Sequence, residues 1–286
     1  MDIGVGLPSV IRGVAGETVL EWARSADQAG FSSLATLDRL VYDNYDSLTT
    51  LAAAAAVTER ARLLTSILIS PLQANTALFA KQAATIDRLS GGRLVLGVAA
   101  GSRPDDFRAS GIEMGGRGNR IEAQVAEARA IWSGERRGFA GGIGPSLPAA
   151  PPILMGGHSP AAINRAARLA DGWISGGGGV EMFRHGVAAF RAAWQAAGRS
   201  GEPKIVSLTY YALGSRADEL ADRYLSDYYG FAPPYAQLVL RNAAVGEAKL
   251  RSTVDALAEI GCSEVVLAPC GADLEQLKEL RTVVGK

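Results

Sequence analysis

Residues 46–101 read DSLTTLAAAAAVTERARLLTSILISPLQANTALFAKQAATIDRLSGGRLVLGVAAG and alternate between two kinds of pattern. Residues 47–57 are rich in alanine and predict a helix, and residues 61–70 form an apolar, β-branched run that predicts a strand. In residues 75–89 the apolar positions follow the helical period until a glycine pair ends the helix. Residues 93–99 then repeat the strand pattern. Helices that alternate with buried strands indicate a parallel sheet covered by helices.

The same alternation continues in both directions and gives about eight strand–helix units. The predicted strands cover residues 3–7, 31–37, 61–70, 93–99, 152–155, 172–175, 204–213 and 264–268. The predicted helices cover residues 18–29, 47–57, 75–89, 119–132, 160–169, 181–197, 216–229, 246–260 and 273–284. Eight units predict one α/β domain over residues 1–286, a single (β/α)8 TIM barrel, and an open doubly wound sheet is the alternative. Residues 134–152, rich in glycine and proline, predict a surface loop or a lid.

The composition excludes several classes of protein. The chain has 286 residues, 48% hydrophobic, and a formal net charge of +0, which is enough for one large core. No apolar run reaches the length of a membrane span, and the first residues lack the basic region of a signal peptide. Two cysteines indicate no disulfide framework, so we expect a cytoplasmic protein. Without a basic cluster, we expect no nucleic-acid partner and no membrane.

In a barrel of this type, the active site lies where the strands end. Two histidines without an HxH pattern argue against a metal site, and we expect none. The only lysine in a predicted strand, Lys204, is at the wrong end for a Schiff base. No pair of carboxylates at the ends of two strands supports a glycosidase.

What remains at the strand ends is a rim rich in glycine. The stretches MGGHS, residues 155–159, and SGGGGVEMF, residues 175–183, each open a predicted helix. Backbone N–H groups at helix starts favour anions, and glycine allows a phosphate to approach closely. Two such turns on neighbouring strands indicate one ligand that carries a phosphate. The alternative is that these glycines only form tight turns.

At this point the sequence resembles the luciferase-like flavin and deazaflavin oxidoreductases. Residues 46–101 resemble the central motif of that family, and PPILMGGHSPAAINRAARLADGW, residues 151–173, is similar to its second signature. VGEAKLRSTVDALAEIGCSEVVLAP, residues 245–269, is similar to its C-terminal segment. The family fold is a (β/α)8 barrel, in agreement with the number of units.

The resemblance implies roles for particular residues. The third strand of the family often has a bulge with a non-prolyl cis peptide behind the cofactor ring, which here corresponds to Ser66–Ile67, next to Thr65. Asp38 lies where many deazaflavin enzymes place a carboxylate beside the cofactor; a helix or loop cap is the alternative. The other implied cofactor-binding residues are Ala100, Gly101, Gly156, Gly157, Ser175, Gly176, Gly177, Gly178 and Gly179.

The chain also departs from the family pattern. Arg39 and Ser102 replace a histidine and a glutamate of the family's sugar-phosphate dehydrogenases, which argues against sugar oxidation. The sequence pattern lacks the family's long insertion before the last barrel units, so we expect an open site.

The resemblance therefore implies an oxidoreductase that uses reduced coenzyme F420 to deliver hydride to a small organic substrate. Asp38, Arg39, Tyr42 and Ser102 are the candidate catalytic residues, and Tyr45 and Tyr210 are further groups that could face the substrate. One alternative is an FMN-dependent monooxygenase of the same family, and another is a barrel that binds no redox cofactor and acts as a binding protein. Family resemblance also implies a homodimer.

Overall fold

The computed structural model describes residues 1–285; Lys286, the last residue of the predicted domain, lies outside the described residues. Eight parallel strands close into a barrel, because β9 pairs with both β8 and β11 and the chain of pairings returns through β1. Around the barrel they follow the order β1, β2, β3, β4, β7, β8, β9 and β11. The strands of the barrel are β1 (Asp2–Gly6), β2 (Ser33–Thr36), β3 (Arg62–Ile69), β4 (Leu94–Ala99), β7 (Ile153–Gly156), β8 (Gly172–Ser175), β9 (Lys204–Ala212) and β11 (Glu264–Pro269). The predicted barrel is confirmed, and the doubly wound alternative is wrong.

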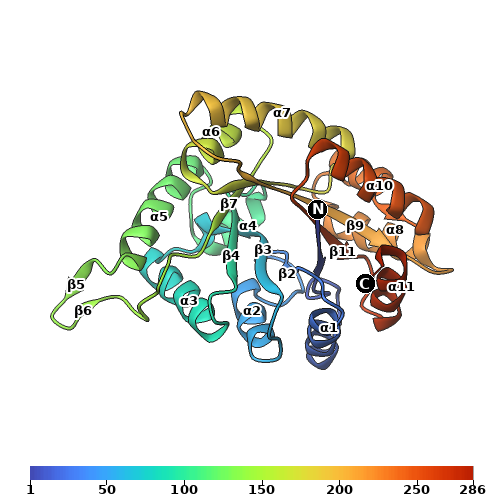
Figure 1. Cartoon of the computed structure of the whole chain (residues 1–286), viewed down its shortest axis with the longest axis horizontal. Helices are drawn as coiled ribbons and strands as arrows, with labels where there is room; N and C mark the ends of the chain where they lie inside the picture. Colours follow the sequence, from blue (N-terminus) through green and yellow to red (C-terminus); the bar gives the residue numbers. More distant parts are fainter. Residues whose placement is uncertain (286) are drawn as a thin grey trace.

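Helices surround the strands, as Figure 1 shows. Most were predicted within a few residues of their observed ends. They are α1 (Gly16–Gln28), α2 (Ser47–Ala55), α3 (Thr76–Leu89), α5 (Arg117–Trp132), α6 (Pro160–Leu169), α7 (Val180–Ala196), α8 (Ala217–Tyr228), α10 (Glu247–Ile260) and α11 (Leu274–Val284). Side chains cap several of these starts: Asp46, Asn75 and Ser159 each accept a hydrogen bond from a backbone N–H in the first turn of α2, α3 and α6.

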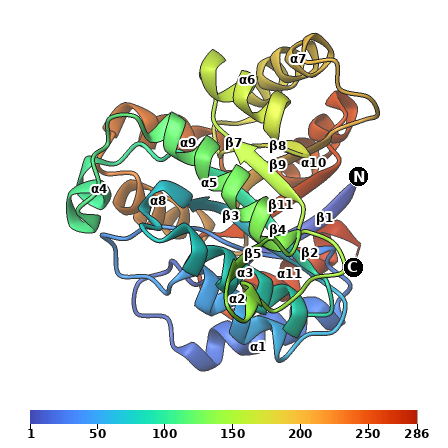
Figure 2. The same cartoon turned by 90° about the vertical axis from the view of Figure 1, so that its left-hand side faces the viewer.

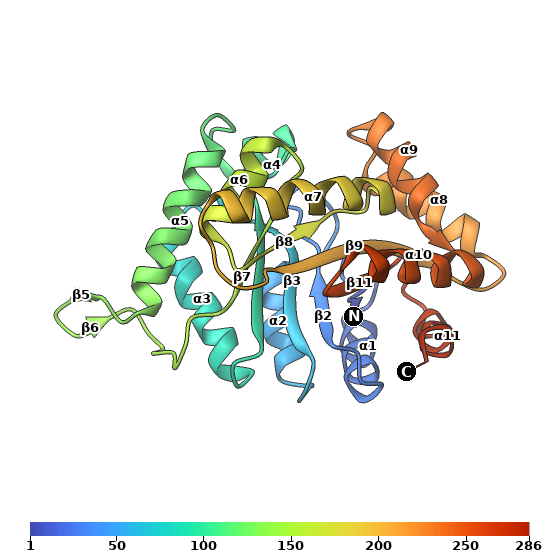
Figure 3. The same ribbon diagram turned by 45° about the horizontal axis from the view of Figure 1, so that its top comes forward.

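Six elements were not predicted. The helix α4 (Pro104–Ser110) follows β4, and α9 (Pro233–Asn242) precedes the short strand β10 (Ala244–Val245); a 3-10 turn, η1 (Ser70–Leu72), ends β3. In Figures 2 and 3, α4, α8 and α9 lie at one end of the molecule. The strands β5 (Arg136–Gly138) and β6 (Gly141–Gly142) form a hairpin that projects from the body in Figure 1. None of residues 134–152 lines the cavity described below, which favours a surface loop over a lid.

The core has two layers that follow the alternation of side chains along the strands. On β3, β9 and β11, the residues Leu63, Ile205 and Val265 pack outward with the helices. Their neighbours Leu64, Val206 and Val266 belong to a second cluster that fills the barrel and extends to α8. A filled interior leaves the ends of the strands as the place for a site.

Candidate active site

A cavity of about 860 Å³ lies at the C-terminal ends of the strands. This volume is within the range of about 300–1,000 Å³ that is typical of small-molecule sites. The predicted site residues that line it are Asp38, Arg39, Ser66, Ile67, Ala100, Gly101, Ser102, Gly156, Gly157, Ser175 and Gly176. Residues far apart in the sequence thus meet at one mouth of the barrel.

Five predicted site residues do not line the cavity. Thr65 is fully buried, and its hydroxyl donates to Gly97 O at 2.7 Å, which is the ordinary role of a strand hydroxyl. The Tyr42 hydroxyl donates to the carboxylate of Asp227 on α8. The other three are the turn glycines Gly177, Gly178 and Gly179.

The predicted bulge in β3 is confirmed. The register with β4 shifts between Thr65 and Leu68, and the Ser66–Ile67 peptide is cis. Ser66 is buried, and its hydroxyl has no hydrogen-bond partner among residues 1–285. Buried polar groups normally have a partner, so an unpaired hydroxyl in the wall of a cavity is available to a ligand. The two adjacent hydroxyls of β3 thus have different roles. Thr65 forms a hydrogen bond within the sheet, and Ser66 lines the cavity.

Asp38 follows β2 and lies in the cavity wall. Its Oδ2 accepts a hydrogen bond from Ile69 N at 2.8 Å, and Ser47 Oγ lies 3.4 Å from its Oδ1. Burial raises the pKa of Asp38 to about 6 against the opposing hydrogen bond from Ile69, and the nearby carboxylates of Asp46 and Asp106 add to the increase. The carboxyl thus ties two loops together and keeps acceptor capacity on Oδ1.

Three glycines that line the cavity, here called the cradle, leave little or no room for a side chain because a Cβ would meet neighbouring protein atoms. A Cβ on Gly101 would lie 2.5 Å from Ile69 Cγ2, and one on Gly157 would lie 2.6 Å from Ala162 Cβ. A Cβ on Gly156 would approach the side chain of Ile67 to 3.3 Å. Gly101 and Gly157 also have positive φ angles of 75° and 126°. This cradle, which ends at the start of α6, fits a flat ring and an anion.

Basic residues that the sequence reasoning missed line the same rim. Arg117, at the start of α5, donates from Nε to Gly101 O at 3.0 Å, and Arg165 on α6 donates from Nε to Glu122 at 3.1 Å. His158 also lines the cavity, packs edge-on against Trp173, and has a pKa lowered by burial. A signal for Arg165 was present, because it follows MGGHS within the predicted helix.

An aromatic wall closes one side of the cavity. It consists of Tyr228 and Tyr229 at the end of α8, Phe231 in the following turn, and Tyr235 on α9. The expectation of an open site stays a prediction. The part of this wall on α9 was missed because Pro233 and Pro234 are typical of a break but occupy the first turn of a helix.

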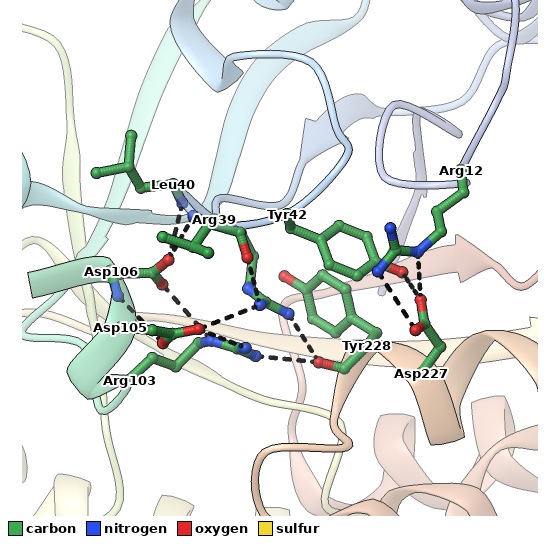
Figure 4. A network of polar contacts seen from close by, with 10 residues as sticks. Arg12, Arg39, Leu40, Tyr42, Arg103, Asp105, Asp106, Asp227 and Tyr228 are labelled. Atoms are coloured by element: carbon green, nitrogen blue, oxygen red, sulfur yellow. Dashed lines mark hydrogen bonds and ion pairs between the residues drawn. The ribbon is translucent and has the colours of Figure 1, made fainter. Parts of the chain in front are cut away.

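Arginines from two loops bind the wall in place, as Figure 4 shows. Arg39, after β2, and Arg103, after β4, both donate to Tyr228 O, at 2.9 and 3.1 Å. Arg39 also donates to Val41 O at 2.8 Å. The same loop is also held from α4, where Asp106 Oδ1 accepts a hydrogen bond from Val41 N at 2.6 Å. Arg39, predicted to face the substrate, therefore uses one donor of each terminal nitrogen on the protein, whereas its Nε has no hydrogen-bond partner in the described chain.

The chain belongs to the luciferase-like monooxygenase family, whose sequence model matches residues 1–257. It is 30% identical to the uncharacterized protein Rv0940c of Mycobacterium tuberculosis over 74% of this chain and 84% of that protein. It is 29% identical to the FMNH(2)-dependent dimethylsulfone monooxygenase of Pseudomonas putida over 75% of this chain and 62% of that protein. The fold is similar to that of an F420-dependent secondary alcohol dehydrogenase in complex with an F420–acetone adduct, with a TM-score of 0.83, 16% identity, and coverage of 99% and 98%.

The protein is thus an enzyme of the luciferase-like family. The proteins it is similar to include both an FMNH(2)-dependent monooxygenase and, in fold, an F420-dependent alcohol dehydrogenase. None of the helices within residues 1–285 is long and apolar enough to span a membrane.

Proposed function

We propose that the protein is an oxidoreductase that uses reduced coenzyme F420 to deliver hydride to a small organic substrate. The bound coenzyme would supply the hydride, and the protein would bind, orient and shield the reactants. The cradle of Gly101, Gly156 and Gly157 would hold the ring and phosphate, with the Ser66 hydroxyl as a polar contact. The same cradle argues against a barrel that binds no cofactor.

The observation that carries this proposal is the buried carboxyl of Asp38 in the cavity wall. The deazaflavin ring has a hydroxyl where FMN has a methyl group. A carboxylate accepts a hydrogen bond from the hydroxyl and gains nothing from the methyl. Within residues 1–285 the only hydrogen bond to Asp38 Oδ1 is the long one from Ser47 Oγ, so this oxygen can accept such a bond.

The basic rim supports the same cofactor. Beyond its phosphate, F420 carries a lactyl and oligoglutamate tail, whereas FMN ends at the phosphate. Arg117 and Arg165 each use Nε on the protein, and no hydrogen bond from the Nη2 of either is found within residues 1–285. Both arginines line the same cavity as Gly157, and these donors would bind carboxylates of the tail.

An FMN-dependent monooxygenase is the second candidate, and the aromatic wall favours it. Oxygen chemistry on a reduced flavin needs shielding from water, and α9 covers a side of the cavity that an open site would expose. The similarity to the FMNH(2)-dependent monooxygenase also supports it.

Titration of the purified protein with F420 and with FMN, followed by fluorescence, tests the choice. F420 should bind, and Asp38→Asn should weaken it about 10- to 100-fold, as expected for loss of a hydrogen bond to a charged group. FMN affinity should change less than about 3-fold, since its methyl group makes no such bond. Asp43→Asn, an exposed carboxylate in the same loop, is the matched control and should change neither. Tight binding of FMN without F420, or an equal effect of Asp38→Asn on both, would replace this proposal with the monooxygenase.

A further inference from the structure

The hydroxyl of Tyr228 is a polar group in the cavity wall that nothing in the fold uses. The residue is 6% exposed and lines the cavity, and no hydrogen bond from its hydroxyl is found within the described chain. The hydroxyls of three nearby tyrosines are either paired or enclosed. Tyr229 and Tyr210 pair their hydroxyls at 2.7 Å, and the unpaired hydroxyl of Tyr224 is fully enclosed by protein. The Tyr228 hydroxyl is neither paired nor enclosed, so it is available to a molecule in the cavity.

The backbone of Tyr228 is held from two sides. It is the last residue of α8, where carbonyl groups lack partners within the helix and the helix dipole is negative. Arg39 and Arg103 bring two guanidinium groups to its carbonyl oxygen from two different loops of the barrel. Asp105 lies 4.0 Å from Arg39 and 3.4 Å from Arg103 and offsets part of their charge. These contacts fix the point from which the side chain projects.

The ring is held as well, as Figure 4 shows for two of its neighbours. The guanidinium carbon of Arg39 lies 5.2 Å from the ring centroid, and Tyr42 packs edge-on at 5.3 Å. Tyr224 and Tyr229 contact the ring at 5.5 and 5.0 Å. A donor fixed in this way needs little reorganisation when charge develops on a bound substrate.

Burial keeps the hydroxyl of Tyr228 protonated. Burial raises the pKa of Tyr228 well above neutrality; Arg39 and Arg103 oppose this, and Asp38 and Asp106 add to it. The hydroxyl is therefore a proton donor at neutral pH, and it lies within the electrostatic reach of Asp38. Tyr235 has no hydrogen bond from its hydroxyl within residues 1–285 either, but only burial raises its pKa, and it lies beside Gly176, outside this charged group.

We propose that Tyr228 is a catalytic residue that donates a hydrogen bond, and then a proton, to the oxygen of a carbonyl substrate. This rests on the proposed function and names its substrate class as ketones or aldehydes. A bound reduced deazaflavin would supply the hydride for the new C–H bond. The π electrons of the carbonyl would move to its oxygen, and that oxygen would take the proton of the Tyr228 hydroxyl. The oxidised cofactor and an alcohol result, and water returns a proton to the phenolate.

A binding experiment tests the donor without any turnover. The probe is 4-dimethylaminocinnamaldehyde, whose visible absorption moves to longer wavelength when its carbonyl oxygen accepts a hydrogen bond. The wild-type protein should produce this shift, and Tyr228→Phe, which keeps the ring and its packing, should abolish it. Tyr224→Phe, one turn earlier on α8, removes a hydroxyl that has no partner and does not line the cavity, so it should retain the shift.

Kinetics with reduced F420 and cyclohexanone give the second measurement. Tyr228→Phe should lower kcat about 100-fold or more, as for loss of a general acid, with KM changed less than about 3-fold. A retained spectral shift in Tyr228→Phe, no shift with the wild type, or loss of the shift in Tyr235→Phe alone would overturn the assignment. If F420 fails to bind but the shift still depends on Tyr228, the proposed cofactor is wrong and the donor stands. If F420 reduces the ketone equally well in Tyr228→Phe, the donor is wrong and the proposed function stands.

Discussion

Both ends of the barrel bury a carboxylate, but the pKa of the carboxylate is lowered at one end and raised at the other. At the N-terminal end, Glu264 begins β11 and is 2% exposed. Its carboxylate accepts from Ser32 Oγ at 2.6 Å and Arg62 Nη2 at 2.9 Å, and Lys204 Nζ lies at 3.1 Å. Burial acts to raise the pKa of Glu264, and these partners outweigh it, so the pKa lies below its ordinary value.

At the C-terminal end, burial prevails. The pKa of Asp38 is raised to about 6 because its hydrogen bonds do not offset the loss of water. Ser66 Oγ and Arg39 Nε are buried there without hydrogen-bond partners in the described chain. Such unpaired groups oppose folding, whereas the paired group at the other end favours it. The difference teaches that one end serves stability and the other holds polar groups ready for a ligand.

Removal of Glu264 is the change with the largest expected effect. Glu264→Ala leaves the guanidinium of Arg62 and the amine of Lys204 without their shared partner. We expect a loss of about 3 kcal/mol in the free energy of unfolding, at the low end for a broken buried pair because both cations are about a third exposed. Thermal unfolding at pH 7 should show a decrease in Tm of about 6 °C.

The pH dependence of this effect follows from the lowered pKa. A lowered pKa stabilises the fold above the unfolded value of about 4.5, and this contribution is lost as the pH falls through the folded pKa. The difference between wild type and Glu264→Ala should therefore shrink in acid. F420 affinity should not change, and a large change in affinity would contradict the separation of the two ends.

Asp38→Asn should act in the opposite direction. The amide oxygen can still accept from Ile69 N, and the substitution removes a charge that burial disfavours. The rise in pKa from 3.8 to about 6 corresponds to about 3 kcal/mol at about 1.4 kcal/mol for each pKa unit. The neutral amide accepts a weaker hydrogen bond from Ile69 N, which offsets about 1 kcal/mol, so we expect the free energy of unfolding at pH 8 to be about 2 kcal/mol higher than in the wild type.

The sign of this prediction depends on pH. Below about 3.8, the ordinary pKa of the group, both states of the wild type are protonated and the gain should vanish. Between 3.8 and about 6 the unfolded chain loses its proton first, so the wild type is progressively destabilised and the gain grows. Urea unfolding at pH 3.5, 5 and 8 measures this, and a gain that is equal at all three would show that Asp38 is ionised without penalty.

The fold followed from the sequence because its signals are local. The alternation of apolar runs and helical periods located all eight barrel strands within a few residues of their ends. The hairpin of β5 and β6 and the helix α9 were missed, since a three-residue strand carries little pattern and Pro233–Pro234 is typical of a break as well as of a helix start.

The site was only partly predictable because it depends on contacts between distant loops. Strand ends and the family resemblance indicated Asp38, the bulge at Ser66 and the glycine cradle, all of which lie at the cavity. They did not indicate Tyr228, whose place depends on two arginines 189 and 125 residues away in the sequence. Tyr42 was predicted at the site because it follows β2, but its hydroxyl binds Asp227 on α8 and the residue does not line the cavity.

Tyr42→Phe is the change with the smallest expected effect. The hydroxyl donates to Asp227, and burial together with this bond raises the pKa of Tyr42 to about 12. Asp227 is 43% exposed and keeps the hydrogen bond from Arg12 Nε at 2.7 Å, so it stays paired and hydrated in the variant. The phenylalanine ring can still pack edge-on against Tyr228.

We therefore expect the free energy of unfolding to fall by about 0.5 kcal/mol, as for a hydrogen bond near the surface, with F420 affinity and kcat within about 2-fold of the wild type. Tyr228→Phe is the matched comparison, because both tyrosines contact Arg39 but only Tyr228 lines the cavity. Side-by-side urea unfolding and steady-state kinetics of the two variants measure the contrast. A 10-fold loss of kcat in Tyr42→Phe would place its hydroxyl on the substrate, as the sequence alone predicts, and would show that the rim of the barrel rearranges when substrate binds.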